Sequence, residues 1–201
     1  MAERAFPADG YTALGPGKLA AVVTYLEMTA PPASAPPAPV GWHLDPIGAD
    51  VARYRRLYAE IGDPWLWTSR RIMADAALAA ILSDPRVEAF AVHEDGRDVG
   101  IVELDYRGHD PEVAFFGFVP DRTGRGLGRP AMAQAVARAF ARPGTRRLFL
   151  HTCTLDDPRA IGFYRACGFT PYARAIEVLD DPRLTGRMPR TCAPHVPVIE
   201  A

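Results

Sequence analysis

The sequence is almost free of lysine, since Lys18 is the only one among its 201 residues. Arginines supply the rest of its positive charge, so Lys and Arg together number 23 against 24 Asp and Glu, and the formal net charge is -1. Such a balanced charge gives no electrostatic reason to expect nucleic acid or an anionic membrane as the main partner. We therefore predict that the chain binds neither.

Cysteine is also scarce, and long apolar runs are missing. Cys153, Cys167 and Cys192 form no C-x-x-C pair, which argues against a disulfide framework or a zinc site, and we predict no metal. The N-terminal residues have no apolar core typical of a signal peptide, and no stretch reaches the roughly 20 apolar residues of a membrane span. A cytoplasmic protein is the expectation.

Residues 1–40 are predicted to form an N-terminal extension. The run over residues 18–28 is rich in β-branched and aromatic types and indicates a strand, whereas the proline-rich residues 30–39 indicate an extended spacer over the surface. This strand could extend a sheet or pair with a second chain, because unpaired strand edges are templates for pairing. We favour a homodimer.

Residues 41–178 are predicted to form the main domain, and residues 179–201 an irregular tail. Helical spacing of apolar residues is found in the first helix at 51–61 and in a second stretch at 69–82. Strands are expected at 87–93, 98–105, 113–119, 147–152 and 169–178, with helices at 126–141 and 158–166. This order predicts an α/β (α+β) fold, a mixed sheet whose first half is antiparallel and whose second half includes a helical crossover.

Two tryptophans, Trp65 and Trp67, stand between the first two helical stretches. They are equally well interpreted as a hydrophobic plug or as the wall of a pocket, because connections between elements often carry binding residues. We leave both interpretations open.

A glycine-rich turn lies between the strand that ends near Val119 and the following helix. Gly124, Gly126 and Gly128 let the backbone turn tightly and point several N–H groups at one place, beside the positive end of the helix dipole. This pattern predicts an anion site. A Walker loop is excluded because Arg129 and Pro130 follow the last glycine, and a dinucleotide fingerprint is disfavoured because Arg129 stands where its third glycine belongs.

The same segment resembles the pyrophosphate motif of the GNAT acetyltransferases, Gln/Arg-x-x-Gly-x-Gly/Ala. Gly126 and Gly128 match the two glycine positions, and Thr123 departs from the usual Gln or Arg. A second segment resembles the GNAT pattern Asn-x-x-Ala-x-x-x-Tyr-x-x-x-Gly-Phe, with Ala160, Tyr164, Gly168 and Phe169 in register and Asp157 in place of Asn. Across residues 45–178 the chain looks like a member of a bacterial GNAT subgroup.

The resemblance implies a GNAT fold, with a central twisted, mostly antiparallel sheet of about six to seven strands, here with an extra N-terminal strand. It also implies acetyl-CoA, or another acyl-CoA, as co-substrate. The residues implied to bind it are Phe118, Val119, Thr123, Gly124, Arg125, Gly126, Leu127, Gly128, Arg129, Asp157, Ala160 and Tyr164.

The reaction implied by the resemblance is direct attack of a primary amine on the thioester in a ternary complex. Tyr164 matches the family tyrosine that protonates the departing sulfur. Glu112, Glu103 and His151 are our candidates for the base, and His109 is a further one. Cys153 is interpreted as a small buried residue rather than a nucleophile.

We therefore expect an N-acetyltransferase that acts on an amine-bearing small molecule or peptide. The alternative is a catalytically weak acyl-CoA-binding module with a regulatory or assembly role, which the departures at Thr123 and Asp157 keep open.

Overall fold

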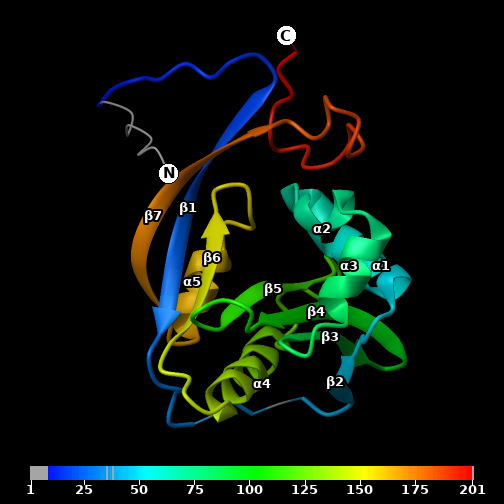
Figure 1. Ribbon diagram of the computed structural model, residues 1–201, viewed down its shortest axis with the longest axis vertical. Coiled ribbons are helices and arrows are strands. Elements are labelled where there is room, and N and C mark those ends of the chain that lie inside the picture. Colours follow the sequence, from blue (N-terminus) through cyan, green and yellow to red (C-terminus); the bar gives the residue numbers. More distant parts are fainter. Residues whose placement is uncertain (1–8, 35, 38, 201) are drawn as a thin grey trace.

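The structure, a computed structural model, describes residues 9–34, 36–37 and 39–200 (Figure 1). The strands in this part of the chain are β1 (Lys18–Met28), β2 (Trp42–Pro46), β3 (Val87–Glu94), β4 (Arg97–Asp105), β5 (Glu112–Phe118), β6 (Leu148–Cys153) and β7 (Thr170–Asp180). The helices are α1 (Val51–Gly62), the 3-10 turn η1 (Asp63–Trp65), α2 (Ser69–Ile72), α3 (Asp75–Leu82), α4 (Gly128–Ala141) and α5 (Ala160–Ala166).

All seven strands belong to one sheet in the order β2-β3-β4-β5-β6-β1-β7. Neighbours pair antiparallel except for β5 and β6, which are parallel because α4 forms a crossover between them. The mixed, mostly antiparallel sheet flanked by helices confirms the predicted fold class. In Figure 1, α1, α2 and α3 lie on one side of the view and the long strands β1 and β7 on the other.

Strand β1 lies inside the sheet rather than at its edge. Val23 is aligned with Cys153 of β6 on one side and with Ala175 of β7 on the other. The predicted extension thus contributes an integral strand to the sheet of the main domain, and it leaves β7 as the edge strand. β7 also continues two residues past the predicted end, to Asp180.

Helix α1 forms because its apolar residues recur at helical spacing and the Asp50 side chain accepts the Arg53 amide at its start. The predicted helix over 69–82 is instead two helices, since Met73 and Ala74 are extended. The Arg55 side chain donates to the carbonyls of Arg70, Arg71 and Met73, which stabilises this break. Among the helices of the described segments, none combines the length and apolar character needed to cross a membrane.

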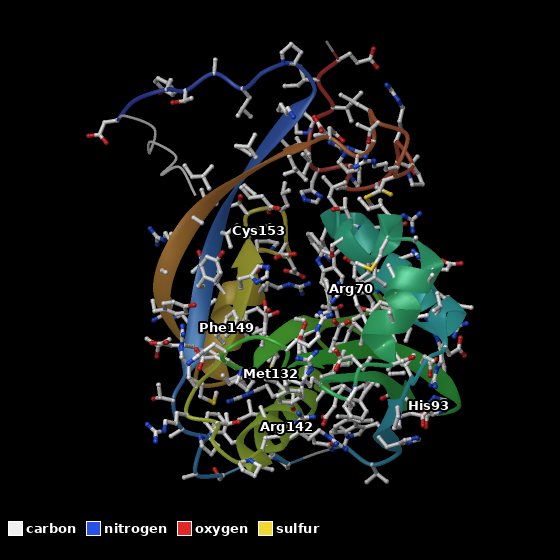
Figure 2. All side chains as sticks on the ribbon, viewed as in Figure 1. Arg70, His93, Met132, Arg142, Phe149 and Cys153 are labelled. Atoms are coloured by element: carbon white, nitrogen blue, oxygen red, sulfur yellow. The ribbon has the colours of Figure 1, made fainter. Side chains whose placement is uncertain are left out.

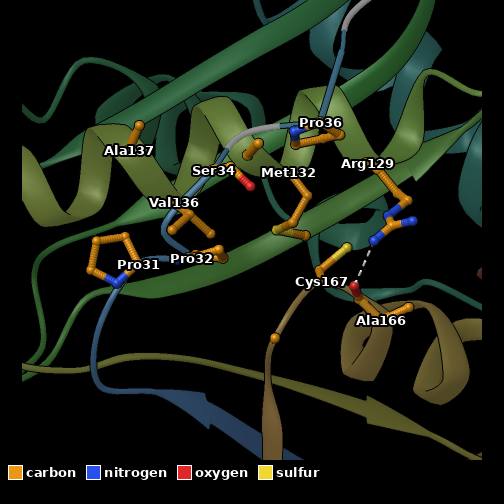
Figure 3. A pocket seen from close by; sticks show the side chains of 12 residues that line it. Pro31, Pro32, Ser34, Pro36, Arg129, Met132, Val136, Ala137, Ala166 and Cys167 are labelled. Atoms are coloured by element: carbon orange, nitrogen blue, oxygen red, sulfur yellow. Dashed lines mark hydrogen bonds between the residues drawn. The ribbon is translucent and has the colours of Figure 1, made fainter.

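The proline-rich connector between β1 and β2 packs over α4. Pro31, Pro32 and Pro36 face Met132 and neighbouring residues of α4 across a small cavity of about 250 Å³ (Figure 3). The connector is long because it has to carry the chain from the end of β1 to β2 at the far edge of the sheet. Residues 35 and 38 of this predicted spacer lie outside the described residues.

After β7 the described residues of the C-terminal tail form no helix or strand, and a buried arginine holds them in place. Arg183 is 3% exposed, forms an ion pair with Asp181 at 2.7 Å, and donates to the carbonyls of Cys192, Ala193 and Val196. Met188, Cys192 and Ala193 pack against Leu66, the residue after η1. The tail thereby buttresses the connection between α1 and α2.

We predict that Arg183→Met loosens the tail, because it leaves Asp181 and three backbone carbonyls buried without their donor. Removing one partner of a buried pair costs about 3–5 kcal/mol, and here the loss falls on the local structure of residues 181–196. Amide hydrogen exchange in this segment should become at least tenfold faster. Arg190→Met, which breaks an exposed ion pair with Glu200, is the matched control and should change exchange little. Equal exchange in both variants would contradict the prediction.

Candidate active site

The sheet opens between β5 and β6. These strands are aligned at only one position, Glu112 with Phe149, near the start of both strands, and they diverge beyond it. A cavity of about 630 Å³ lies in this opening. Its walls come from β5, β6, β7, the segment 65–69 and the N-terminal part of α5. In Figure 2, Cys153 at the end of β6 and Arg70 on α2 lie on either side of this region.

Strand β5 supplies one continuous wall, and residues 113–118 all line the cavity. The strand has a bulge at Ala114, because Glu103 of β4 is aligned with Phe115 and Leu104 with Val113. Among the described residues, no strand pairs with 113–118 on the β6 side. The inner edge of β5 therefore presents backbone N–H and C=O groups to whatever occupies the cavity.

The predicted anion loop borders the cavity through Thr123, Gly124 and Gly128. Gly124 and Gly126 have φ of +80° and +94°, conformations that favour glycine, and a Cβ at either would meet open space. Within the described residues, nothing accepts a hydrogen bond from the amides of Gly124, Gly126 or Leu127. Together with the first turn of α4, these amides form a site suited to phosphate.

The side chains of the loop have different surroundings. The Thr123 hydroxyl lies 3.2 Å from the Val119 carbonyl and closes the turn, while Arg125 is exposed beside it. Leu127 and Val119 are buried and anchor the loop in the core. The Arg129 side chain is directed away from the large cavity, since it donates to the Ala166 carbonyl beside the small one (Figure 3).

Helix α5 brings Tyr164 and Ala160 to the cavity wall. Burial raises the pKa of Tyr164 well above its usual value, with the Asp156 charge adding to the effect, so the phenol keeps its proton at neutral pH. Phe163 stacks on Phe116 of β5 at 5.5 Å between ring centroids, which fixes the helix against the strand. Gly168 ends the helix with φ of +100°, as predicted.

Asp157 and Asp156 have different partners. Asp157 lines the cavity but forms an ion pair with Arg159 at 2.6 Å, which lowers its pKa. Asp156 accepts hydrogen bonds from Trp67 Nε1 at 2.9 Å, Thr152 Oγ1 at 2.7 Å and the Cys153 amide at 2.9 Å. It therefore joins the segment 65–69 to the end of β6. Trp65 and Trp67 both form part of the cavity wall, and Trp67 also packs against the hydrophobic core, so both interpretations of the sequence apply to Trp67.

His151 and Glu112 form a pair at the edge of the cavity. His151 Nδ1 lies 2.9 Å from Glu112 Oε1, and the imidazole is 48% exposed while the carboxylate is 25% exposed. Because a carboxylate only accepts, Nδ1 donates, and a neutral imidazole then has its lone pair on Nε2. The hydrogen bond to Glu112 raises the pKa of His151, although burial opposes it. Glu112 itself does not line the cavity.

The other candidate bases lie elsewhere. Glu103 is fully buried, with one oxygen 2.6 Å from Arg70 Nη2 and the other bonded to the Tyr54 hydroxyl. Both of its oxygens thus have donors, and it does not line the cavity. His109 is 97% exposed beside Asp110 on the loop before β5. Cys153 lines the cavity, but burial raises the pKa of its thiol to about 11, which disfavours the thiolate.

Sequence reasoning missed Asp156 as a connecting residue and Glu177 of β7 as part of the cavity wall. Asp156 lies beside Asp157 in the second motif, but its partners Trp67 and Thr152 come from distant segments. Glu177 has no local signal, because its face is set by pairing with Ala21 of β1. In the described residues, no cluster of three or more His, Cys, Asp or Glu is placed to hold a metal ion.

Comparison with solved structures shows the same fold in several proteins. A conserved protein of unknown function from Staphylococcus epidermidis is 14% identical with a TM-score of 0.60, and the match covers 82% of this chain and 63% of that one. An acetyltransferase from Thermus thermophilus is 22% identical with a TM-score of 0.52, over 70% and 98% of the two chains. An aminoglycoside acetyltransferase from an uncultured soil sample, solved with sisomicin, is 15% identical with a TM-score of 0.51, over 63% and 87%.

This chain thus spans less than two thirds of the Staphylococcus protein. No curated protein matches it significantly in sequence. The model of the acetyltransferase (GNAT) family matches residues 54–169, which is more than half of the chain and includes the glycine loop, Tyr164 and the opening between β5 and β6. The chain belongs to the GNAT family of acetyltransferases.

Proposed function

We propose that this protein is an acyl-CoA-dependent N-acyltransferase that transfers an acetyl or other short acyl group to a primary amine. One observation carries the proposal. A single opening in the sheet joins a glycine loop with open amides to a His151–Glu112 pair and to Tyr164. An anion site, a base and a proton donor around one cavity are what amine acylation from a phosphate-bearing thioester requires.

The donor end is formed by the loop and the inner edge of β5. The amides of Gly124, Gly126 and Leu127 and the dipole of α4 are suited to the diphosphate of CoA. The unpaired edge at 113–118 is suited to the amide groups of its pantetheine arm. When bound, acetyl-CoA supplies an activated acyl group on a thiol that can leave. Arg122 and Arg159 add positive charge on this side, although both have acidic partners.

His151 is the residue we propose as base. Glu112 orients the imidazole and leaves Nε2 as the atom that accepts the ammonium proton of the acceptor. Glu112 is then a positioning residue rather than the base itself. Glu103 has no role in this proposal, because it is enclosed by Arg70 and Tyr54.

Tyr164 is the residue we propose to return a proton to the departing sulfur. Tyr164 lines the cavity, and within the described residues its hydroxyl forms no hydrogen bond with another protein group. Burial keeps it protonated, which suits a proton donor.

The acceptor is proposed to be an amine-bearing small molecule or peptide. A cavity of about 630 Å³ with aromatic walls is in the range of small-molecule sites. The solved aminoglycoside acetyltransferase with the same fold makes aminoglycosides one reasonable group for an amine screen. A homodimer and a cytoplasmic location remain proposals as well.

The experiment that tests the function combines calorimetric titration with acetyl-CoA and a thiol assay for free CoA over a panel of amines. Micromolar binding and amine-dependent CoA release would support the enzyme. Binding without release by any amine would favour a regulatory acyl-CoA-binding module. No binding would overturn the proposal.

We predict that Gly126→Ala weakens acetyl-CoA binding at least tenfold. A non-glycine residue at positive φ costs roughly 1–2 kcal/mol, so the loop would relax and its amides would no longer converge. Gly144→Ala is a matched control, because Gly144 is exposed, has φ of +86° and lies after α4, outside the cavity. It should bear the same backbone cost and bind normally in calorimetry. Equal weakening in both variants would argue against the loop as the donor site.

We predict that activity rises with pH through the titration of His151, because only the neutral imidazole accepts a proton. The Glu112 hydrogen bond raises the pKa of His151, so Glu112→Gln should move the acidic limb of kcat/KM to lower pH. His151→Ala should reduce kcat by about 100-fold. Glu60→Gln, which alters an exposed ion pair on α1, should leave the pH profile in place. A limb that stays fixed in Glu112→Gln would contradict the assignment.

We predict that Tyr164→Phe lowers kcat by about 100-fold with little change in acetyl-CoA affinity, since only the proton donor is removed. Steady-state kinetics and calorimetry on the same protein separate the two effects. Tyr172→Phe, an exposed tyrosine on β7, serves as the control. Full turnover in Tyr164→Phe would remove the assignment.

A further inference from the structure

The charged residues that line the cavity differ in whether they already have a partner in the protein. Arg122 and Arg159 belong to the glycine loop and to the segment before α5, and each forms an ion pair with a carboxylate. Asp157, the partner of Arg159, also lines the cavity, as do Asp156 in the loop after β6 and Glu177 on β7. We assign the side formed by β6 and β7 to the acceptor because it carries His151, and Glu177 adds a negative charge there.

Glu177 is the acidic residue available to a ligand. Asp156 already accepts three hydrogen bonds, whereas Glu177 forms no hydrogen bond or ion pair within the described residues. Glu177 is aligned with Ala21 of β1, whose side chain is too small to cover the carboxylate. Its charge reaches the neighbouring groups: the pKa of His151, raised chiefly by Glu112, is raised further by Asp156 and Glu177.

Aromatic side chains line the helical side of the cavity, across from β6 and β7 (Figure 1). Trp65 and Trp67 face it from the connection between α1 and α2, and Tyr58 of α1 contributes a third ring. Aromatic ring faces, above all that of tryptophan, attract ammonium groups. The same rings also pack against hydrocarbon chains. These walls suit a chain that is apolar along its length and cationic at its ends.

The strand register gives the scale of such a ligand. Tyr25 aligns with His151 and Ala21 aligns with Glu177, so the two groups lie four residues apart along β1 and on opposite sides of it. Strand spacings put their Cα atoms roughly 16 Å apart, on the same face of the sheet. Because both side chains extend into one cavity, an acceptor would span on the order of 10 Å between the two.

We propose that the acceptor is a di- or polyamine, whose second ammonium group binds Glu177 while the first is acylated beside His151. This inference rests on the proposed function and names its substrate class. Glu177 is then a specificity-determining residue that acts on binding, and His151 serves the reacting amine. A monoamine of the same length would fill the cavity but leave Glu177 unpaired.

The test compares octylamine with octamethylenediamine, two acceptors of equal chain length that differ by one ammonium group. With the 201-residue protein and acetyl-CoA, kcat/KM per amino group should favour the diamine by about fivefold, as for a partly solvated ion pair, mainly through KM. Glu177→Gln should bring this ratio close to one. The ratio is informative because any effect of Glu177 on His151 acts on both amines alike.

Asp180→Asn is the matched control, since it removes one negative charge from the same strand on the opposite face, where Asp180 pairs with Lys18. It should keep the diamine preference. A ratio near one in the unmodified protein, or a preference that survives in Glu177→Gln, would overturn this inference while the N-acyltransferase function stands. Turnover of other amines of the panel but of neither octyl compound would also overturn this inference alone, whereas no turnover of any amine would overturn both.

Discussion

The separation of β5 from β6 is the constraint on which the rest of the structure depends. Beyond one aligned pair, Glu112 with Phe149, the facing edges of these two central strands are not paired with each other. Unpaired backbone groups inside a protein are costly unless another partner satisfies them. The opening is tolerated because it is a solvent-accessible cavity with aromatic walls, and it is useful because a ligand with amide groups can replace the missing strand.

Asp156 keeps this opening in shape. Its three hydrogen bonds connect Trp67, on the helical side, to Thr152 and the Cys153 amide on β6. A second support comes from the tail, where Met188 and Ala193 pack on Leu66 and Arg183 holds the tail together. Both walls are thus fixed by long-range contacts, and the cavity does not depend on the short helices α2 and η1 alone.

The parts of the fold that were predicted from sequence are the local ones. The glycine loop, α5 and Gly168 follow from positive-φ positions, helix termini and spacing within about 15 residues, which a pattern can reveal. The break at Met73–Ala74 was missed, because both residues are acceptable in a helix and only the capture of carbonyls by Arg55 favours it. The position of β1 between β6 and β7 was also missed. Val23 pairs with Cys153, which is 130 residues away in the sequence, and no local pattern indicates that pairing.

The candidate site divides in the same way. Tyr164 and the loop glycines belong to contiguous motifs, and His151 with Glu112 were recognisable as titratable residues on adjacent strands, although their contact was not. Glu103 has the same residue type as Glu112, yet it faces the Arg70–Tyr54 cluster, and only side-chain packing separates the two. The position of Glu177 depends on β1 in two ways. That strand places β7 beside the cavity, and its register with β7 sets which face of β7 is turned toward the cavity. The N-terminal strand therefore bears on the proposed substrate: without it between β6 and β7, Glu177 would not be turned toward the cavity, and the proposed acceptor would lose the carboxylate that is free to bind its second ammonium group.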